Sequence, residues 1–326
     1  MHSDIQHTQM VMGVAIAIAM LGTLSLSLLG RWIGGVWTTL LATLAACLLA
    51  YQPLCNSMVF SRLATDRQQR IWFAAIPFTI LLIGLSFKRV PMLARLTVAL
   101  LGPALMLCWV FYGYDKTVPM STIFLQKILP VSTVLFATWA LLEPIAIRTP
   151  GTAAPMTIAF LGTGCGFLLM LSSENQAGLM GLLVPAAAGG TALAAIIAAI
   201  IRRPITSARG PVLLWLTLLA SEFAYLWIPH STKELPLSYL AWLASVPLLA
   251  WIPEIGPIHR LKPWKRESLR LLLVLAPVIV AIVLANQQHK KEATESGDEY
   301  GFAYPAAPIL PSQIPIPNTI PPPTIT

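Results

Sequence analysis

Residues 178–201 read GLMGLLVPAAAGGTALAAIIAAII, and no charged side chain interrupts them. A helix that crosses the hydrocarbon core of a bilayer needs about 20 mostly apolar residues, because it rises about 1.5 Å per residue. This stretch is long enough and apolar enough throughout. It therefore predicts a membrane-spanning helix.

The same pattern recurs along most of the chain, which is 56% hydrophobic and only 10% charged. The gaps between the apolar stretches are too short to hold a nucleotide-binding or catalytic domain. We therefore expect an all-α fold, a polytopic integral membrane bundle of about ten transmembrane helices. The stretches are 10–29, 33–51, 71–87, 96–113, 124–147, 155–172, 178–201, 211–229, 236–252 and 269–286.

Three regions follow from this pattern: a short N-terminal tail at 1–9, a transmembrane domain at 10–286 and a tail at 287–326. The tail is polar at first and rich in proline from Pro305 onward. Such a composition cannot bury a core and favours extended polyproline conformations, so we expect the tail to be disordered. The P-x-x-P spacing between Pro305 and Pro311 leaves open a second interpretation, a docking peptide.

The distribution of Lys and Arg predicts the orientation. If ten helices cross the membrane in alternating directions, 13 of the 21 basic residues lie on the same side of the membrane as residues 254–268, and 8 lie on the other side. Because cytoplasmic loops of membrane proteins are enriched in Lys and Arg, we expect 254–268 in the cytoplasm. Both termini would then lie on the outer face of the plasma (inner) membrane. The net charge of +8 is explained by this bias, and we expect no nucleic-acid partner.

Residues 254–268 are the most basic of the expected loops, and Trp264 lies within them. Polybasic segments beside a membrane attract anionic lipid headgroups. The segment is therefore either a headgroup-binding patch or simply the strongest determinant of topology. The lipid bilayer is the one partner that the sequence predicts; protein partners stay unknown.

Glu222 is the outstanding candidate for chemistry. It lies 11 residues after Pro211, near the middle of the stretch 211–229, with Ser221 beside it and Tyr225 on the same helical face. An ionised carboxylate at that depth is costly, and an intramembrane acid is by default a functional hypothesis. We expect Glu222 to face the bundle interior and to be largely protonated, either as a proton carrier or as a neutral hydrogen-bonding group between helices.

Two further charged residues are weaker candidates. Glu143 lies about one turn before the end of its predicted helix, and Lys127 lies near the opposite end. Sixteen residues separate them, so at 100° per residue they point to opposite faces of a regular helix. They do not form one polar stripe.

Small residues mark two helices for close packing. Small side chains spaced by four positions let helix backbones approach each other in lipid. An alternative interpretation is a pore or substrate wall lined by small residues. The residues are Gly162 and Gly166 in one helix, and Ala186, Gly190 and Ala194 in the next.

Several classes of function are excluded by what the sequence lacks. None of the five histidines falls inside a predicted span, which argues against haem ligation, a membrane zinc site and a serine–histidine dyad. No nucleotide-binding motif is present. We therefore expect no enzyme activity, no cofactor and no metal site. The pattern favours a small-molecule transporter with Glu222 as its proton site, and the alternative is a non-catalytic membrane scaffold or complex subunit.

Overall fold

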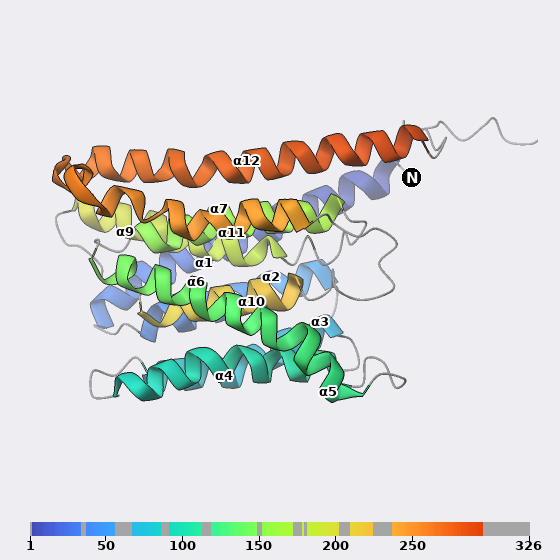
Figure 1. Ribbon diagram of the computed structural model, residues 1–326, viewed down its shortest axis with the longest axis horizontal. Helices are drawn as coiled ribbons and strands as arrows, with labels where there is room; N and C mark the ends of the chain where they lie inside the picture. The colour runs from blue at the N-terminus through green and yellow to red at the C-terminus, as the bar shows by residue number, and fades with distance from the viewer. Residues whose placement is uncertain are drawn as a thin grey trace, which may run out of the picture. The chain divides into compact units, whose positions relative to one another are not determined.

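The computed structural model describes residues 2–33, 37–55, 67–85, 91–112, 119–148, 152–171, 178, 181–201, 209–223 and 237–295. All regular structure in these ranges is helical, and no strand occurs within them (Figure 1). The chain divides into two units, Met1–Asn286 and Gln287–Thr326. Each of the ten predicted stretches overlaps a helix.

The helices follow one another along the chain with short connections. In order they are α1 (His2–Ile33), α2 (Trp37–Cys55), α3 (Arg67–Leu85), α4 (Met92–Phe111), α5 (Met120–Ile123), the π-helical turn η1 (Phe124–Ile128), α6 (Leu129–Arg148), α7 (Ala153–Leu171), α9 (Leu183–Ile200), α10 (Arg209–Phe223), α11 (Leu237–Leu249), the 3₁₀ turns η3 (Ile252–Glu254) and η4 (Gly256–Arg260), and α12 (Pro263–Glu295).

Six segments in the described part of the chain are long and apolar enough to cross a membrane. Shorter apolar helices cover 38–50, 70–84 and 211–221. By length and composition the protein is thus a helical membrane protein. The six segments are Met10–Leu29, Met92–Phe111, Met120–Ala146, Ala153–Leu171, Leu183–Ile200 and Trp264–Lys291.

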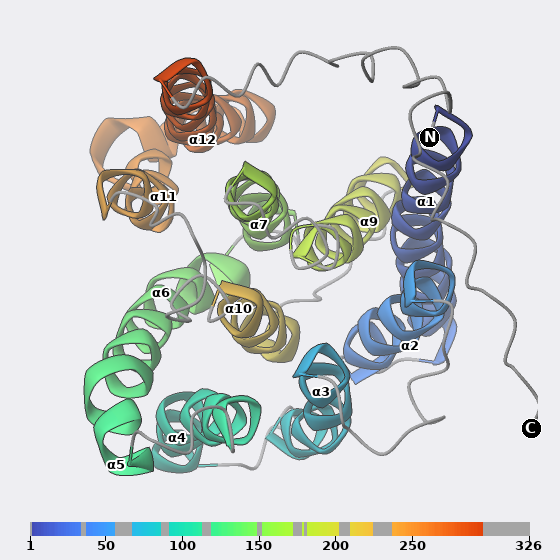
Figure 2. The same cartoon turned by 90° about the vertical axis from the view of Figure 1, so that its right-hand side faces the viewer.

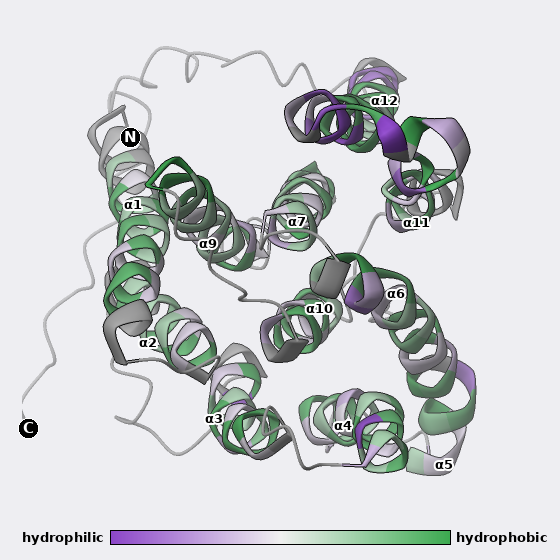
Figure 3. Ribbon diagram, turned by 90° about the vertical axis from the view of Figure 1, so that its left-hand side faces the viewer, coloured by the Kyte–Doolittle hydropathy of each residue, from purple (hydrophilic) through white to green (hydrophobic). Residues whose placement is uncertain are grey.

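The surface of the helices agrees with this assignment. Leu93, Leu105, Leu125, Ile80 and Leu272 are each more than 60% exposed. A soluble monomer rarely exposes so many large apolar side chains, whereas lipid tails solvate them. Figure 3 shows apolar residues along most helices and hydrophilic residues gathered near α12, on the side of α11.

Helices α1 and α12 continue beyond the predicted apolar stretches 10–29 and 269–286. Helix α1 begins at His2, so residues 2–9, expected as a tail, are helical. Helix α12 begins at Pro263 and runs to Glu295, beyond the predicted bounds 269–286, and it includes His289. Proline is favoured in the first turn of a helix, and residues 287–295 (QQHKKEATE) are mostly good helix formers. The proline-rich residues of the expected tail lie outside the described residues.

The core of the first unit lies between closely packed helices. Helix α1 packs against α2 and α9, and α7 packs against α9. Figure 2 shows these helices end-on, with α10 between α6, α7 and α3. The largest fully buried side chains include Trp72, Trp215, Leu40 and Ile71.

Candidate functional site

Helix α10 is the most enclosed helix of the first unit that the structure describes. Every residue from Pro211 to Ser221 is buried. The helix packs against α2, α3, α4, α6, α7 and α9 (Figure 2). A helix that is apolar on all sides is stable only where packing or lipid covers all sides, and here other helices cover them.

The polar groups on α10 that the structure describes are hydrogen-bonded. The Ser221 hydroxyl donates to the carbonyl of Thr217 at 2.8 Å, and the Thr217 hydroxyl donates to the carbonyl of Leu213 at 2.7 Å. The Trp215 indole N–H donates to the Thr43 hydroxyl of α2 at 3.3 Å. These bonds satisfy the donors without using a neighbouring carboxylate.

The other two residues of the candidate site with Ser221 are Glu222 and Tyr225, and they lie at the edge of the described region or beyond it. The backbone of Glu222 is in α10, next to the buried Ser221, and its side chain lies outside the described residues. Tyr225 follows the end of α10 and lies wholly outside them. The arrangement of the three side chains therefore stays a prediction.

The two weaker candidates, Glu143 and Lys127, lie in an α-helix and a π-helical turn, respectively. Glu143 is half-buried in α6, one residue before Pro144. The backbone of Lys127 belongs to the π-helical turn η1, and its side chain lies outside the described residues. Sequence reasoning assumed a regular helix through both positions and did not anticipate this turn.

The small residues lie where helices approach most closely. A side-chain carbon at Gly190 would lie 2.2 Å from the carbonyl oxygen of Met20 in α1. One at Gly162 would lie 3.0 Å from Leu219 of α10, and one at Gly166 would lie 2.7 Å from Leu182. Ala194 is buried and Ala186 half-buried on α9. These positions lie within packed helix contacts, as required for close approach of backbones.

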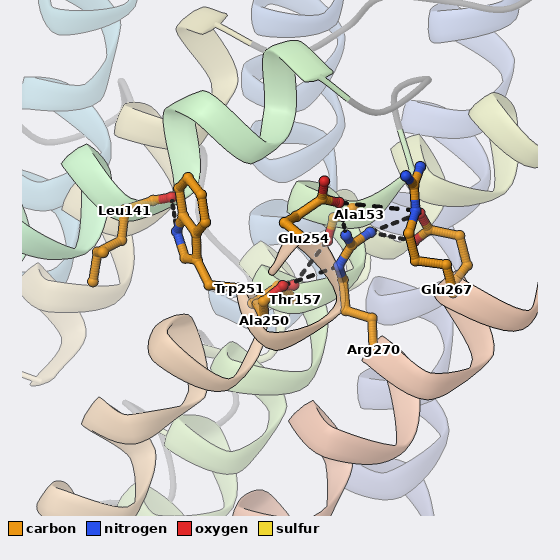
Figure 4. Close-up of polar contacts among 9 residues, drawn as sticks. Leu141, Ala153, Thr157, Ala250, Trp251, Glu254, Glu267 and Arg270 are labelled. Atoms are coloured by element: carbon orange, nitrogen blue, oxygen red, sulfur yellow. Dashed lines mark hydrogen bonds and ion pairs between the residues drawn. The ribbon is translucent and has the colours of Figure 1, made fainter. Parts of the chain in front are cut away.

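A cluster of charged side chains, which sequence reasoning missed, lies between α11 and α12. Its centre is Arg270, whose side chain is 3% exposed. The Arg270 guanidinium donates to both carboxylate oxygens of Glu267, at 2.7 and 2.6 Å, and to the carboxylate of Glu254 (Figure 4). Its Nε donates to the carbonyl of Ala250 at 3.1 Å. One guanidinium thus joins the end of α11, η3 and the first turns of α12. We call Glu254, Arg266, Glu267 and Arg270 the charge cluster.

The fourth member of the charge cluster is less tightly held. The Arg266 Nε lies 3.9 Å from the nearer Glu254 oxygen and 4.0 Å from Glu267, and it has no hydrogen-bond partner among the described residues. The Glu254 side chain is only 2% exposed. Two carboxylates and two guanidinium groups balance, so the cluster is neutral overall.

Two local features hold the connection between α11 and α12 in place. Gly256 has a φ of 61°, a left-handed conformation that glycine adopts without steric cost, and it turns the chain from η3 into η4. The Trp251 indole N–H donates to the carbonyl of Leu141 in α6 at 2.7 Å (Figure 4). Residues 254–268, expected as a loop, therefore form the end of η3, η4 and the first turns of α12.

A small pocket adjoins the charge cluster on its α7 side. Its walls include Ala153, Thr157 and Phe160 of α7, together with Glu267 and Arg270 of α12. It has room for about one water molecule. The Thr157 hydroxyl donates to the carbonyl of Ala153 at 2.8 Å. The pocket is too small for a substrate and serves as part of the packing around Arg270.

No group of three or more His, Cys, Asp or Glu side chains lies close enough to hold a metal ion within the described ranges. The buried cysteines Cys47 and Cys165 are on separate helices and are not disulfide-bonded. Comparison with known proteins gives no match to a family model, a curated protein or a solved structure.

Proposed function

We propose that the protein is a membrane carrier for a small molecule, with about ten membrane-crossing helices arranged around α10. Glu222, with Ser221 and Tyr225, is the proposed proton or substrate site. The observation that carries the proposal is the complete burial of residues 211–221, because it brings the segment that bears the acid into contact with six other helices. We expect the carboxyl of Glu222 to lie among these helices, away from bulk water, which is the environment of a proton site in a carrier.

The proposal of ten crossings also needs four helices that are not among the six clear candidates, namely α2, α3, α10 and α11. Helices α2 and α3 have 19 residues each, which is near the minimum length for a crossing. Helices α10 and α11 have 15 and 13 residues, and residues 224–236 between them lie outside the described ranges. Tilt, thinning of the bilayer or further helical residues would allow them to span.

One observation favours the second candidate function, a non-catalytic subunit or scaffold. The described hydroxyl and indole donors of α10 are all bonded within the bundle, which is the pattern expected of structural hydrogen bonds between and within helices. In such a protein, Glu222 would be a neutral group that links α10 to a neighbour.

Substitution of Glu222 by glutamine separates the two functions. The protein is reconstituted into liposomes that contain a trapped pH-sensitive dye. A panel of amino acids, organic cations and sugars is then added across an imposed pH gradient. For a carrier we expect at least one compound to move protons with the wild-type protein. We expect Glu222→Gln to abolish that movement, because glutamine keeps the shape but cannot bind and release a proton.

Glu143→Gln is the matched control, since it makes the same chemical change at a half-buried acid outside α10. We expect this variant to retain most of the flux. A silent Glu222→Gln, together with a loss of about 1 kcal/mol of stability in Glu222→Leu, would support the scaffold instead. If Glu143→Gln abolishes the proton movement and Glu222→Gln retains it, the proton site is on α6.

The proposed orientation places both termini on the outer face and 254–268 in the cytoplasm. The bias of Lys and Arg supports it. In addition, α1 and α12 begin at opposite ends of the first unit in Figure 1. We test it by labelling Lys262→Cys and Ser312→Cys in a background without the native cysteines. In intact cells, an impermeant maleimide should modify position 312 and leave position 262 unmodified. The reverse pattern would mean that the orientation is inverted.

A further inference from the structure

Cationic and apolar side chains are exposed close together in the chain between residues 255 and 265, from the end of η3 into the first turn of α12. Arg260, Lys262 and Lys265 are exposed. Beside them in the chain, Ile255, Leu261 and Trp264 are 62%, 41% and 64% exposed. The Lys265 Nζ lies 5.6 Å from the centre of the Trp264 ring. We call these six residues the platform.

The charge cluster keeps the nearby acidic groups away from the platform. Glu254 and Glu267 are the only acids between residues 251 and 270. Both bind Arg270, and the Glu254 side chain is almost fully buried. Within the described residues, the three platform cations form no ion pair with either of them. The surface of this segment therefore carries a positive charge that its own carboxylates do not neutralise.

We propose that the platform binds the phosphate of an anionic lipid headgroup. Arg260, Lys262 and Lys265 supply the charge, because basic side chains near a membrane surface bind anionic lipid. The neighbouring apolar side chains decide between a lipid and a free phosphate ion. Tryptophan and aliphatic side chains next to cations are suited to the boundary between headgroups and acyl chains, and a free ion would gain nothing from them.

Arg270 acts in this proposal as a positioning residue. Its bonds to the Ala250 carbonyl, Glu254 and Glu267 fix η3 and the first turns of α12 relative to each other. All six platform residues lie between Glu254 and Glu267 in the chain. The inference does not depend on transport, because a carrier and a scaffold would both use such a site.

The test measures lipid retention by the full-length protein. Purified protein in a neutral detergent is titrated with phosphatidylglycerol or with phosphatidylcholine of the same acyl chains, and bound lipid is counted by native mass spectrometry. We expect tighter retention of phosphatidylglycerol. The triple variant Arg260→Gln/Lys262→Gln/Lys265→Gln should lose this preference by tenfold or more, given the contribution of each basic residue near an anionic surface. Binding of phosphatidylcholine should stay the same.

Lys290→Gln/Lys291→Gln is the control for net charge, because it removes positive charge near the other end of α12. It should leave the preference nearly unchanged. Trp264→Ala should weaken phosphatidylglycerol binding and leave any binding of inorganic phosphate unchanged. The wild-type preference should also decrease with added salt, a readout that needs no variant.

Three results would overturn the proposal. The first is a triple variant that folds and keeps the wild-type preference. The second is a control variant that loses as much preference as the triple variant, since the effect would then follow total charge. The third is full displacement of the lipid by millimolar inorganic phosphate with no effect of Trp264→Ala, which would identify the site as one for a free phosphate ion.

Discussion

Replacing Arg270 with methionine is expected to lower the free energy of unfolding by about 3–5 kcal/mol, the range found when one partner of a buried ion pair is removed. The Arg270 and Glu254 side chains are 3% and 2% exposed, so water cannot replace the lost guanidinium. The substitution also leaves the Ala250 carbonyl without its Arg270 donor. Methionine occupies a similar volume to arginine. The decrease in the free energy of unfolding therefore comes from the lost charge and hydrogen bonds rather than from a cavity.

Thermal or denaturant unfolding in detergent micelles, followed by far-ultraviolet circular dichroism, measures this effect. Arg266→Met is the matched control, because Arg266 lies one turn earlier on α12 and approaches Glu254 only to 3.9 Å. It should lose much less stability. The double variant Glu254→Gln/Arg270→Met should recover part of the loss, since no buried charge is then left unpaired by Arg270. Equal losses in the Arg266 and Arg270 variants would contradict the central position of Arg270.

The sequence predicted where the helices lie because membrane helices have a simple requirement for length and apolarity. Residues 178–201 and 155–172 show it, since the bounds of both predicted stretches lie within five residues of those of the observed helices, Leu183–Ile200 and Ala153–Leu171. The apolar pattern did not indicate that helix α1 includes residues 2–9 or that helix α12 continues through residues 287–295. Those residues are polar, and an apolar window cannot detect a helix that continues beyond the apolar part.

The charge cluster was harder to predict. Glu267 and Arg270 are three residues apart, a spacing that favours a side-chain pair on a helix, so this half could have been recognised. Glu254 precedes Arg270 by 16 residues, and two 3₁₀ turns bring them together. No periodic pattern in the sequence indicates that contact. From sequence, residues 254–268 therefore indicate a basic loop, as a headgroup-binding patch or a determinant of topology, and not a buried ion pair.

The central position of α10 could not be predicted from its composition. Its apolar residues would suit a lipid-facing helix equally well, because lipid tails and the protein interior are similarly apolar. Only the packing against six other helices distinguishes the two environments. The sequence did identify Glu222 as unusual, because ionisable side chains within predicted membrane spans are rare and costly.

The contact between α1 and α9 gives the second large expected effect. A side-chain carbon at Gly190 would lie 2.2 Å from the Met20 carbonyl oxygen and 3.2 Å from the Leu24 nitrogen. Both atoms belong to the backbone of α1, which cannot move aside as a flexible side chain can. Gly190→Ala should therefore force the two helices apart and cost about 1–3 kcal/mol or more, even after the better helix propensity of alanine is counted.

Gly189→Ala is the control, one position away on the same helix. The nearest atom to its new side-chain carbon is the Ala159 Cβ at 4.0 Å, an ordinary contact. This variant keeps only the gain in helix propensity, so it should be as stable as the wild type or more stable by up to about 1 kcal/mol. The two alanine variants should thus change stability in opposite directions when their unfolding is measured under one condition. If Gly190→Ala is as stable as Gly189→Ala, then α1 and α9 do not approach at Gly190, and the small residues of α9 do not set the distance between these helices.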